Sequence, residues 1–249
     1  MTTIAAKGLY GFCLLLAVVF ALIGARAHPQ SSAPQAEATQ KPPVRFDMVV
    51  RDDFFAGMFG GDQARFDRAM KFTEDALAKD PRNGEAHVWH GTALMFLSSR
   101  ANIEGNAEKG DELWNRGLKE MDDGVAMDPG NIGVHIGRGA MLLGYATSGA
   151  APDDPPARAI VQKAVADYEF ALSKQRPHFA NIPLHSRGEL LFGLASGWSL
   201  LGDEQKARAY LEEIVKECPD SDYATEAQAL LVKTPLERVE HTCIGCHAG

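Results

Sequence analysis

The sequence predicts an all-α protein built from consecutive helices. Between residues 45 and 233, apolar residues recur at i, i+3, i+4 and i+7, which is the spacing of one face of an α-helix. No stretch alternates between apolar and polar residues for long enough to indicate a β-strand. Residues that favour helix N-termini stand just before the periodic runs, at Asn83, Asn131, Asp154 and Asp203.

The chain begins with a segment typical of a secretory signal peptide, residues 1–27. Lys7 supplies a positive charge, an apolar run extends from Gly8 to Gly24, and Ala25-Arg26-Ala27 has the small–x–small pattern of a cleavage site. The run of about 17 residues is near the lower limit for a membrane span, so an uncleaved anchor is the alternative and the only expected membrane association. We therefore expect an exported protein of the periplasm or cell envelope of a bacterium.

Residues 28–44 predict a disordered linker, because four prolines stand among Gln, Ser and Ala and no apolar period runs through them. The whole chain carries a formal net charge of −8. Removal of residues 1–27 takes away two basic residues and no acidic one. An acidic protein repels phosphate backbones, so we expect no nucleic-acid partner.

Short turns are expected between the helices of residues 45–233, and one of them is Phe59-Gly60-Gly61-Asp62. Pro155, after Asp154, stands where a missing N–H costs nothing. The three tryptophans are interpreted as core anchors. Three helix faces are clear, formed by Phe66, Ala69, Met70, Thr73, Ala76 and Leu77, by Trp114, Leu118, Met121 and Val125, and by Ala207, Leu211, Ile214 and Val215.

The ends of three helices resemble one another. Each has an apolar end, a proline that stops the helix and a polar residue that starts the next one, at 76–83, 125–131 and 214–220. The pattern resembles the tetratricopeptide-repeat (TPR) family, whose unit is two helices in about 34 residues. The best unit is Gly188 to Ser221, where Leu194, Ala195, Trp198, Gly202-Asp203, Ala207, Leu211 and Pro219 match the family pattern and Ile214 departs from it.

The resemblance covers most of residues 50–232 and implies a TPR-like α-solenoid of antiparallel helix pairs. Its concave surface, made of the first helices, holds a protein partner in this family. Pro81 and Pro129 are too far apart for one unit, so we expect an insertion of about 14 residues in Ser99–Gly110. The segments Ser148–Pro156 and Gln175–Pro183 are expected to be further long connections.

A short irregular arm, residues 234–249, ends the sequence and contains Cys243-Ile244-Gly245-Cys246-His247. Cys-x-x-Cys-His is the attachment signature of c-type haem: two thiols bind the porphyrin and the adjacent imidazole ligates the iron. The motif predicts one covalent haem c on Cys243 and Cys246, with His247 as axial ligand. Only Ala248 and Gly249 follow, so we expect the haem to rest on the repeats or on another protein.

Two other interpretations of the motif remain open. The two cysteines could form a dithiol or disulfide, or His241 could join them and His247 in a zinc site, although four ligands within seven residues would strain a tetrahedral site. The sixth iron ligand is also open. His185 is the preferred candidate over His178, and an open or intermolecular position is equally compatible with the sequence.

Other candidate residues have simpler interpretations. His87, His90 and His135 could form a metal or haem cluster, but we favour helix packing with hydrogen-bonded imidazoles. Asp52-Asp53 and Asp122-Asp123 point about 100° apart on helices and are interpreted as solvated faces, not acid/base pairs. Cys218 is expected to be a small buried residue.

The sequence thus predicts an exported TPR scaffold that carries one haem and transfers electrons within a protein complex. No phosphate-binding glycine loop and no G-x-S-x-G motif is present, so an electron carrier or binding module is favoured over an enzyme. The first alternative is a non-redox envelope scaffold or assembly factor. The second is a haem sensor or peroxidase-like protein with open iron.

Overall fold

A computed structural model describes residues 45–147 and 154–240, which all belong to one compact unit of the chain. Helices account for 82% of these residues and none of them lies in a strand, so the predicted all-α class is confirmed. The described elements are α1 (Phe46–Met58), α2 (Gln63–Lys79), α3 (Gly84–Ile103), α4 (Ala107–Met127), α5 (Ile132–Thr147), α6 (Pro155–Gln175), the 3₁₀ helix η1 (Arg176–Asn181), α7 (Leu184–Leu200), α8 (Glu204–Glu217) and α9 (Asp222–Leu231).

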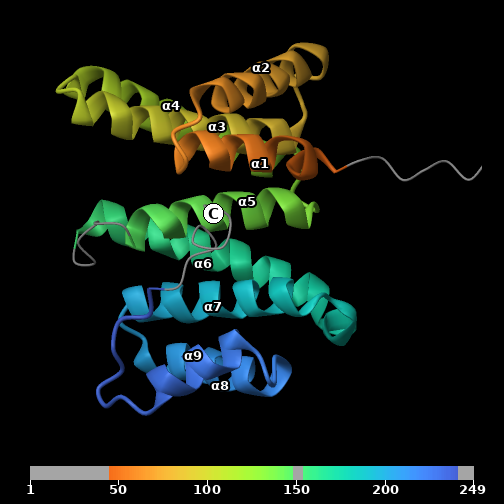
Figure 1. Cartoon of the computed structure of the whole chain (residues 1–249), viewed down its shortest axis with the longest axis vertical. Coiled ribbons are helices and arrows are strands. Elements are labelled where there is room, and N and C mark those ends of the chain that lie inside the picture. The colour runs from red at the N-terminus through yellow and green to blue at the C-terminus, as the bar shows by residue number, and fades with distance from the viewer. Residues whose placement is uncertain (1–44, 148–153, 241–249) are drawn as a thin grey trace, which may run out of the picture. The chain divides into compact units, whose positions relative to one another are not determined.

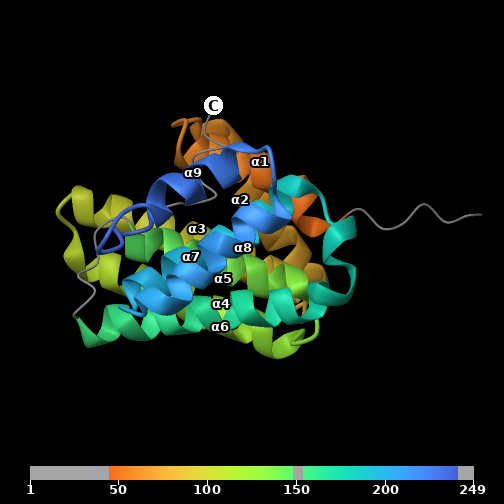
Figure 2. The same cartoon turned by 90° about the horizontal axis from the view of Figure 1, so that it is seen from below.

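Consecutive helices pack in pairs (Figure 1). The pairs are α1 with α2, α3 with α4, α5 with α6, and α7 with α8, while α9 packs on α8. The first helices of successive pairs also touch, because α1 contacts α3, α3 contacts α5, and α5 contacts α7. Figure 2 shows the same order from below, with α8 and α9 nearest the viewer.

Two main hydrophobic clusters hold the described helices together. The smaller joins α1, α2 and α3 around Phe54 and Phe66, with Trp89 stacked on Phe54 at 5.8 Å between ring centroids. The larger extends from α3 to α9 and includes Val239 of the C-terminal arm. Trp89, Trp114 and Trp198 are partly buried and pack against these clusters, so the interpretation as core anchors holds although none is fully buried.

The predicted caps are confirmed by hydrogen bonds. Asn83 Oδ1 accepts from Ala86 N at 3.0 Å, Asp203 Oδ1 from Lys206 N at 3.0 Å, and Asp154 Oδ2 from Ala157 N at 3.3 Å. Asn131 Oδ1 accepts from Gly133 N at 2.8 Å, inside the first turn of α5. Pro155 is the first residue of α6, as expected. Each cap satisfies a backbone donor that the helix itself leaves unpaired.

Two of the expected connections also have the predicted form. Phe59 to Asp62 is the turn between α1 and α2, with Gly61 at φ +72° and Asp62 as the N-cap of α2. The connection from Gln175 to Pro183 contains η1. Most of the connection Ser148–Pro156 lies outside the described residues.

The insertion expected at Ser99–Gly110 takes the form of longer helices and not of a long connection. This segment forms the end of α3, a three-residue turn and the start of α4, and Gly105 makes the turn at φ +83°. The additional residues lengthen both helices, to 20 residues in α3 and 21 in α4, against 17 and 14 in α7 and α8. Helix length therefore accounts for most of the wider spacing between Pro81 and Pro129.

Helices α3 and α4 approach one another closely through glycines spaced seven residues apart. A Cβ on Gly84 would lie 2.6 Å from the carbonyl oxygen of Gly124, and a Cβ on Gly91 would lie 2.6 Å from that of Gly117. One heptad further along α3, Ser98 Oγ donates to the carbonyl of Gly110 at 2.8 Å. These contacts leave no room for side chains, so the glycines set the distance between the two helices.

Candidate functional site

The predicted haem motif and most of its surroundings lie outside the described residues. This applies to His241, Cys243, Cys246 and His247, and also to the predicted signal peptide and linker, residues 1–27 and 28–44. The structure does describe the arm that leads to the motif, up to Glu240. Residues 234–240 form no helix or strand.

This arm is bonded to the helical body at several points. Leu236 N donates to Glu204 Oε1 at 3.1 Å, at the start of α8, and Val239 N donates to Ser199 Oγ at 3.2 Å, at the end of α7. Arg238 Nη2 donates to the carbonyl of Ala146, near the end of α5, at 3.1 Å. Val239 is fully buried. Sequence analysis missed these contacts; a lone valine among charged residues was their only signal.

His185, the preferred candidate for the sixth ligand, lies at the start of α7 and its side chain is half exposed. Its Nδ1 is 2.5 Å from Tyr223 Oη, which donates to Glu189 Oε1 at 2.8 Å. In a neutral imidazole whose Nδ1–H donates to Tyr223, the lone pair is on Nε2. A hydrogen bond to the other ring nitrogen is a common feature of metal-ligating histidines, so the local chemistry fits a ligand.

The position of His185 constrains that role. Ser199, which holds Val239, is at the opposite end of α7, about 21 Å from His185 along the helix axis. His247 follows Val239 by eight residues, which span at most about 28 Å. A haem on His247 reaches His185 only if the arm runs back along α7 for part of that distance, because the two imidazoles and the iron between them span the rest. His178 is exposed in η1, which precedes α7. It is further from the motif in sequence than His185 is.

The histidines of the first helices are hydrogen-bonded, as the packing interpretation predicts. His87 Nε2 lies 2.9 Å from the carbonyl of Pro81, and His135 Nε2 lies 3.1 Å from that of Pro129, in equivalent positions 48 residues apart. His90 bonds Glu120 through Nδ1. Among the residues that the structure describes, no three His, Cys, Asp or Glu side chains are grouped so as to hold a metal ion.

A buried charge cluster joins α5 and α6. Asp167 is 2% exposed and accepts from His135 Nδ1 at 2.6 Å, from Arg138 Nε at 2.7 Å and from Arg138 Nη2 at 2.8 Å. Arg138 also donates to Asp122 on α4 at 2.8 Å, and Lys163 on α6 donates to the same carboxylate. Burial lowers the pKa of Arg138, but the bonds to Asp167 and Asp122 outweigh it and raise the pKa above its usual value. The cluster is a charge-compensated link between helices.

Glu120 on α4 is held in a similar way. Burial is the largest influence and raises its pKa, but hydrogen bonds from His90 and Arg116 more than offset it, so the net pKa lies below the usual value. A carboxylate that stays ionised and paired is poorly suited to act as a general acid. His90 and Glu120 therefore connect α3 to α4.

The adjacent acidic residues are ion-paired, so their interpretation as solvated faces is only partly correct. Asp52 is largely exposed, but Asp53 accepts from Arg65 and Arg68 of α2. The Arg68 hydrogen bond is the main cause that lowers the pKa of Asp53. Asp122 links α4 to α5 and α6, and Asp123 pairs with Lys119. Neither pair has the arrangement of an acid/base site.

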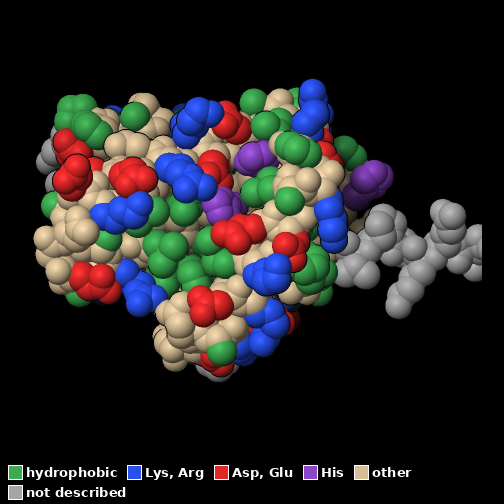
Figure 3. All heavy atoms as spheres, turned by 90° about the horizontal axis from the view of Figure 1, so that it is seen from above, with side chains coloured by type: hydrophobic (Ala, Val, Ile, Leu, Met, Phe, Trp, Pro, Cys, Tyr) green, Lys and Arg blue, Asp and Glu red, His purple; other side chains and the backbone are tan. Residues whose placement is uncertain are grey.

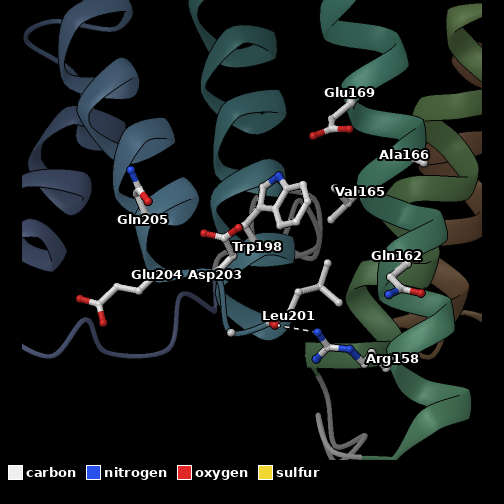
Figure 4. Close-up of a pocket in the computed structure, with 11 residues that line it drawn as sticks. Arg158, Gln162, Val165, Ala166, Glu169, Trp198, Leu201, Asp203, Glu204 and Gln205 are labelled. Atoms are coloured by element: carbon white, nitrogen blue, oxygen red, sulfur yellow. Dashed lines mark hydrogen bonds between the residues drawn. The ribbon is translucent and has the colours of Figure 1, made fainter.

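A groove of about 660 Å³ lies between α6, the end of α7 and the start of α8 (Figure 4). Trp198 projects into it between Val165 and Glu169 on one side and Gln205 on the other. Lys206 Nζ lies 3.4 Å from the centroid of the Trp198 ring, a cation–π contact between α7 and α8. Trp198 thus links α7, to which it belongs, with α8, and it is partly exposed.

Cys218 is fully buried, as expected, and desolvation raises the pKa of its thiol. A raised pKa disfavours the thiolate, so this cysteine is unreactive. None of the helices in residues 45–147 and 154–240 is long and apolar enough to cross a membrane.

Comparisons of the chain with protein-family models, with curated proteins and with solved structures found no match.

Proposed function

We propose that this chain is an exported scaffold protein that carries one covalent haem c on its C-terminal arm and transfers single electrons within a protein complex. The observation that carries the proposal is the sequence Cys243-Ile244-Gly245-Cys246-His247. Cys243 and Cys246 hold the porphyrin through their thiols, and His247 ligates the iron. The haem, when bound, supplies one-electron chemistry. The predicted signal peptide agrees with attachment in the periplasm.

The scaffold is a TPR-like α-solenoid of antiparallel helix pairs. Three features support this assignment: consecutive helices pack in pairs, the first helices of successive pairs touch, and His87 and His135 make the same bond in successive pairs. Pairs that each contact mainly their neighbours are the defining property of a solenoid. Helix α9 covers the last pair through its contact with α8.

The first helices of the solenoid form the surface that docks a protein partner. Helices α1, α3, α5 and α7 adjoin one another and make a continuous surface. Four of the exposed large apolar residues lie in the first pair and are 38–55% exposed: Met48 and Val49 on α1, Phe59 directly after α1, and Phe72 on α2. Figure 3 shows apolar side chains bordered by charged ones at this end of the described body. Such patches favour protein partners.

A non-redox scaffold is the second candidate function. It is favoured by these exposed apolar residues together with the independent core of the body, which needs no haem to be packed. In that case the terminal cysteines only form a crosslink. A spectrum of the purified protein distinguishes the candidates, and a high-spin haem spectrum would favour a sensor or peroxidase instead.

The double substitution Cys243→Ala with Cys246→Ala tests the proposal. We expect it to abolish covalent haem in protein made with a cytochrome maturation system, while the helical circular dichroism is unchanged. Cys218→Ala is the matched control, because it removes a buried thiol that lies outside the motif. This variant should keep the haem. Covalent haem in the double variant would refute the attachment.

The proximal ligand is tested separately. His247→Ala should weaken or block haem attachment, whereas His241→Ala should have little effect, because only His247 directly follows Cys246. Equal shifts of the Soret band in the two variants would contradict the assignment of His247.

A further inference from the structure

We propose that residues 234–240 are an anchor that fixes the haem-bearing end of the chain against one edge of the helical body. This edge is formed by the ends of α5 and α7 and the start of α8. The inference rests on the proposed function for the identity of the haem, but the anchor itself is carried by contacts of described residues. The haem is thereby a positioned part of the body and not a group on a free tail.

The first half of the anchor is held by two charged side chains of α8. Glu204 accepts the Leu236 N–H and is itself fixed by Arg208 Nε at 2.8 Å. Arg208 also donates to the carbonyls of Leu231 and Lys233, at 3.0 Å and 2.5 Å. Charge-assisted hydrogen bonds are about twice as strong as neutral ones. The chain therefore leaves α9 in a defined direction, across the start of α8.

The second half of the anchor is buried. Val239 has no exposed surface and belongs to the main hydrophobic cluster, while its N–H donates to Ser199 Oγ. The hydrophobic effect holds a fully buried side chain in its position, because any displacement would expose its apolar surface to water. Of the described arm residues, Val239 is the last whose side chain is buried, and Glu240 after it is exposed.

Between Leu236 and Val239, the Arg238 side chain makes a hydrogen bond to a helix C-terminus, and two other arginines of the body make the same kind of bond. Its guanidinium donates to the Ala146 carbonyl, one of the last carbonyls of α5, which the helix cannot pair. Arg158 does the same for Leu201 after α7, and Arg208 for Leu231 at the end of α9. A cation at a helix C-terminus is also favoured by the helix dipole. The arm thus caps the C-terminus of α5 as arginines of the body cap those of α7 and α9.

The anchor limits where the haem can lie. Cys243 follows Val239 by four residues, so their Cα atoms are at most about 14 Å apart. The thioether sulfur of Cys243 lies one side chain further out, so it must be within about 17 Å of the Val239 Cα, beside the ends of α5 and α7. The groove beside Trp198 adjoins this edge, because Glu204 both lines the groove and binds Leu236. The partner that exchanges electrons with the haem must therefore approach this edge.

The test combines amide hydrogen exchange with the haem spectrum of the full chain. In wild type we expect the amides of Leu236 and Val239 to exchange at least about 10²-fold more slowly than in an unstructured peptide. Val239→Asp should remove this protection and lower the Soret circular dichroism at least twofold, with the haem still attached. Ser199→Ala and Arg238→Gln are milder variants that keep the test valid if Val239→Asp does not fold. Glu237→Gln, at an exposed arm position, is the control and should change neither signal.

Either of two outcomes overturns the inference. One is exchange of the Val239 amide in wild type at the rate of an unstructured peptide. The other is an unchanged Soret signal in folded variants that have lost the protection. Absence of covalent haem from wild type would instead refute the proposed function, and exchange measured on that same chain would still decide whether the anchor exists.

Discussion

The close glycine contacts between α3 and α4 predict that alanine at Gly91 lowers the stability of the protein, although alanine favours helices. In Gly91→Ala the new Cβ would meet the Gly117 carbonyl oxygen at 2.6 Å, Met121 Cγ at 2.7 Å and Met121 N at 3.1 Å. Two of these three atoms are backbone, so rotation of a side chain cannot relieve the overlap. The helices must move apart by several tenths of an ångström along their whole contact.

The magnitude follows from two opposing effects. Glycine inside a helix is less favourable than alanine by about 0.5–1 kcal/mol, so the substitution on its own would stabilise α3. Overpacking a close contact costs about 1–3 kcal/mol. Because two of the overlapping atoms are backbone, the cost should lie in the upper half of that range. The expected net loss is then about 1–2.5 kcal/mol, which lowers the melting temperature of a body of this size by about 2–10 °C. Adding Gly117→Ala should cost less than the first change, because the helices are then already separated.

Thermal unfolding followed by circular dichroism at 222 nm measures this effect on the full chain. The control is Gly130→Ala, because a Cβ on Gly130 meets nothing within 4 Å and the residue lies in a turn. The control should melt within about 1–2 °C of wild type, as expected of a surface change. A melting temperature raised by Gly91→Ala would show that helix propensity dominates, and that α3 and α4 do not touch through these glycines.

Three further predictions concern the links between helices. Asp167→Asn should destabilise the body by about 3–5 kcal/mol in urea unfolding, because it leaves the buried Arg138 without its main partner. Asp122→Asn, at a half-exposed carboxylate, should cost about 1 kcal/mol or less. Equal losses of stability in the two variants would contradict the burial of the cluster. Trp198→Ala should cost about 2–3 kcal/mol, less than a fully buried aromatic, and keep the haem; an unchanged melting temperature would refute its contacts with α6 and α8. The pKa of Glu204 is lowered mainly by Arg208 and next by the Leu236 N–H. The Glu204 carboxylate therefore binds the arm fully above the usual pKa of 4.5, and this hydrogen bond is lost as the pH falls through the lowered pKa. Exchange of the Leu236 amide, corrected for its intrinsic rate, should accelerate only below pH 4.5, and acceleration between pH 5 and 7 would contradict the hydrogen bond.

The sequence predicted the features that depend on neighbouring residues. The caps at Asn83, Asp154 and Asp203 and the turn at Gly61 were correct, because a side chain that binds a backbone N–H three residues later is a local interaction. The helical class and the burial of Cys218 followed from periodicity and residue type in the same way.

The features that escaped prediction depend on contacts between distant segments. The segment Ser99–Gly110 is rich in residues typical of loops, yet Gly110 lies inside α4, where its carbonyl accepts from Ser98 of α3. Asp167 has no local pattern and is recognised only where His135 and Arg138 reach it. The bond between Arg238 and Ala146 spans 92 residues, so no local pattern predicts this bond.

The central claim, covalent haem on an exported helical scaffold, is tested most directly by a visible spectrum before and after acid–acetone extraction. The protein should be made as the full chain with a cytochrome maturation system. We predict a Soret band that stays with the precipitated protein, at one haem per chain, and a low-spin spectrum that changes reversibly on reduction. A colourless protein, or haem that passes entirely into the acetone, would contradict the account.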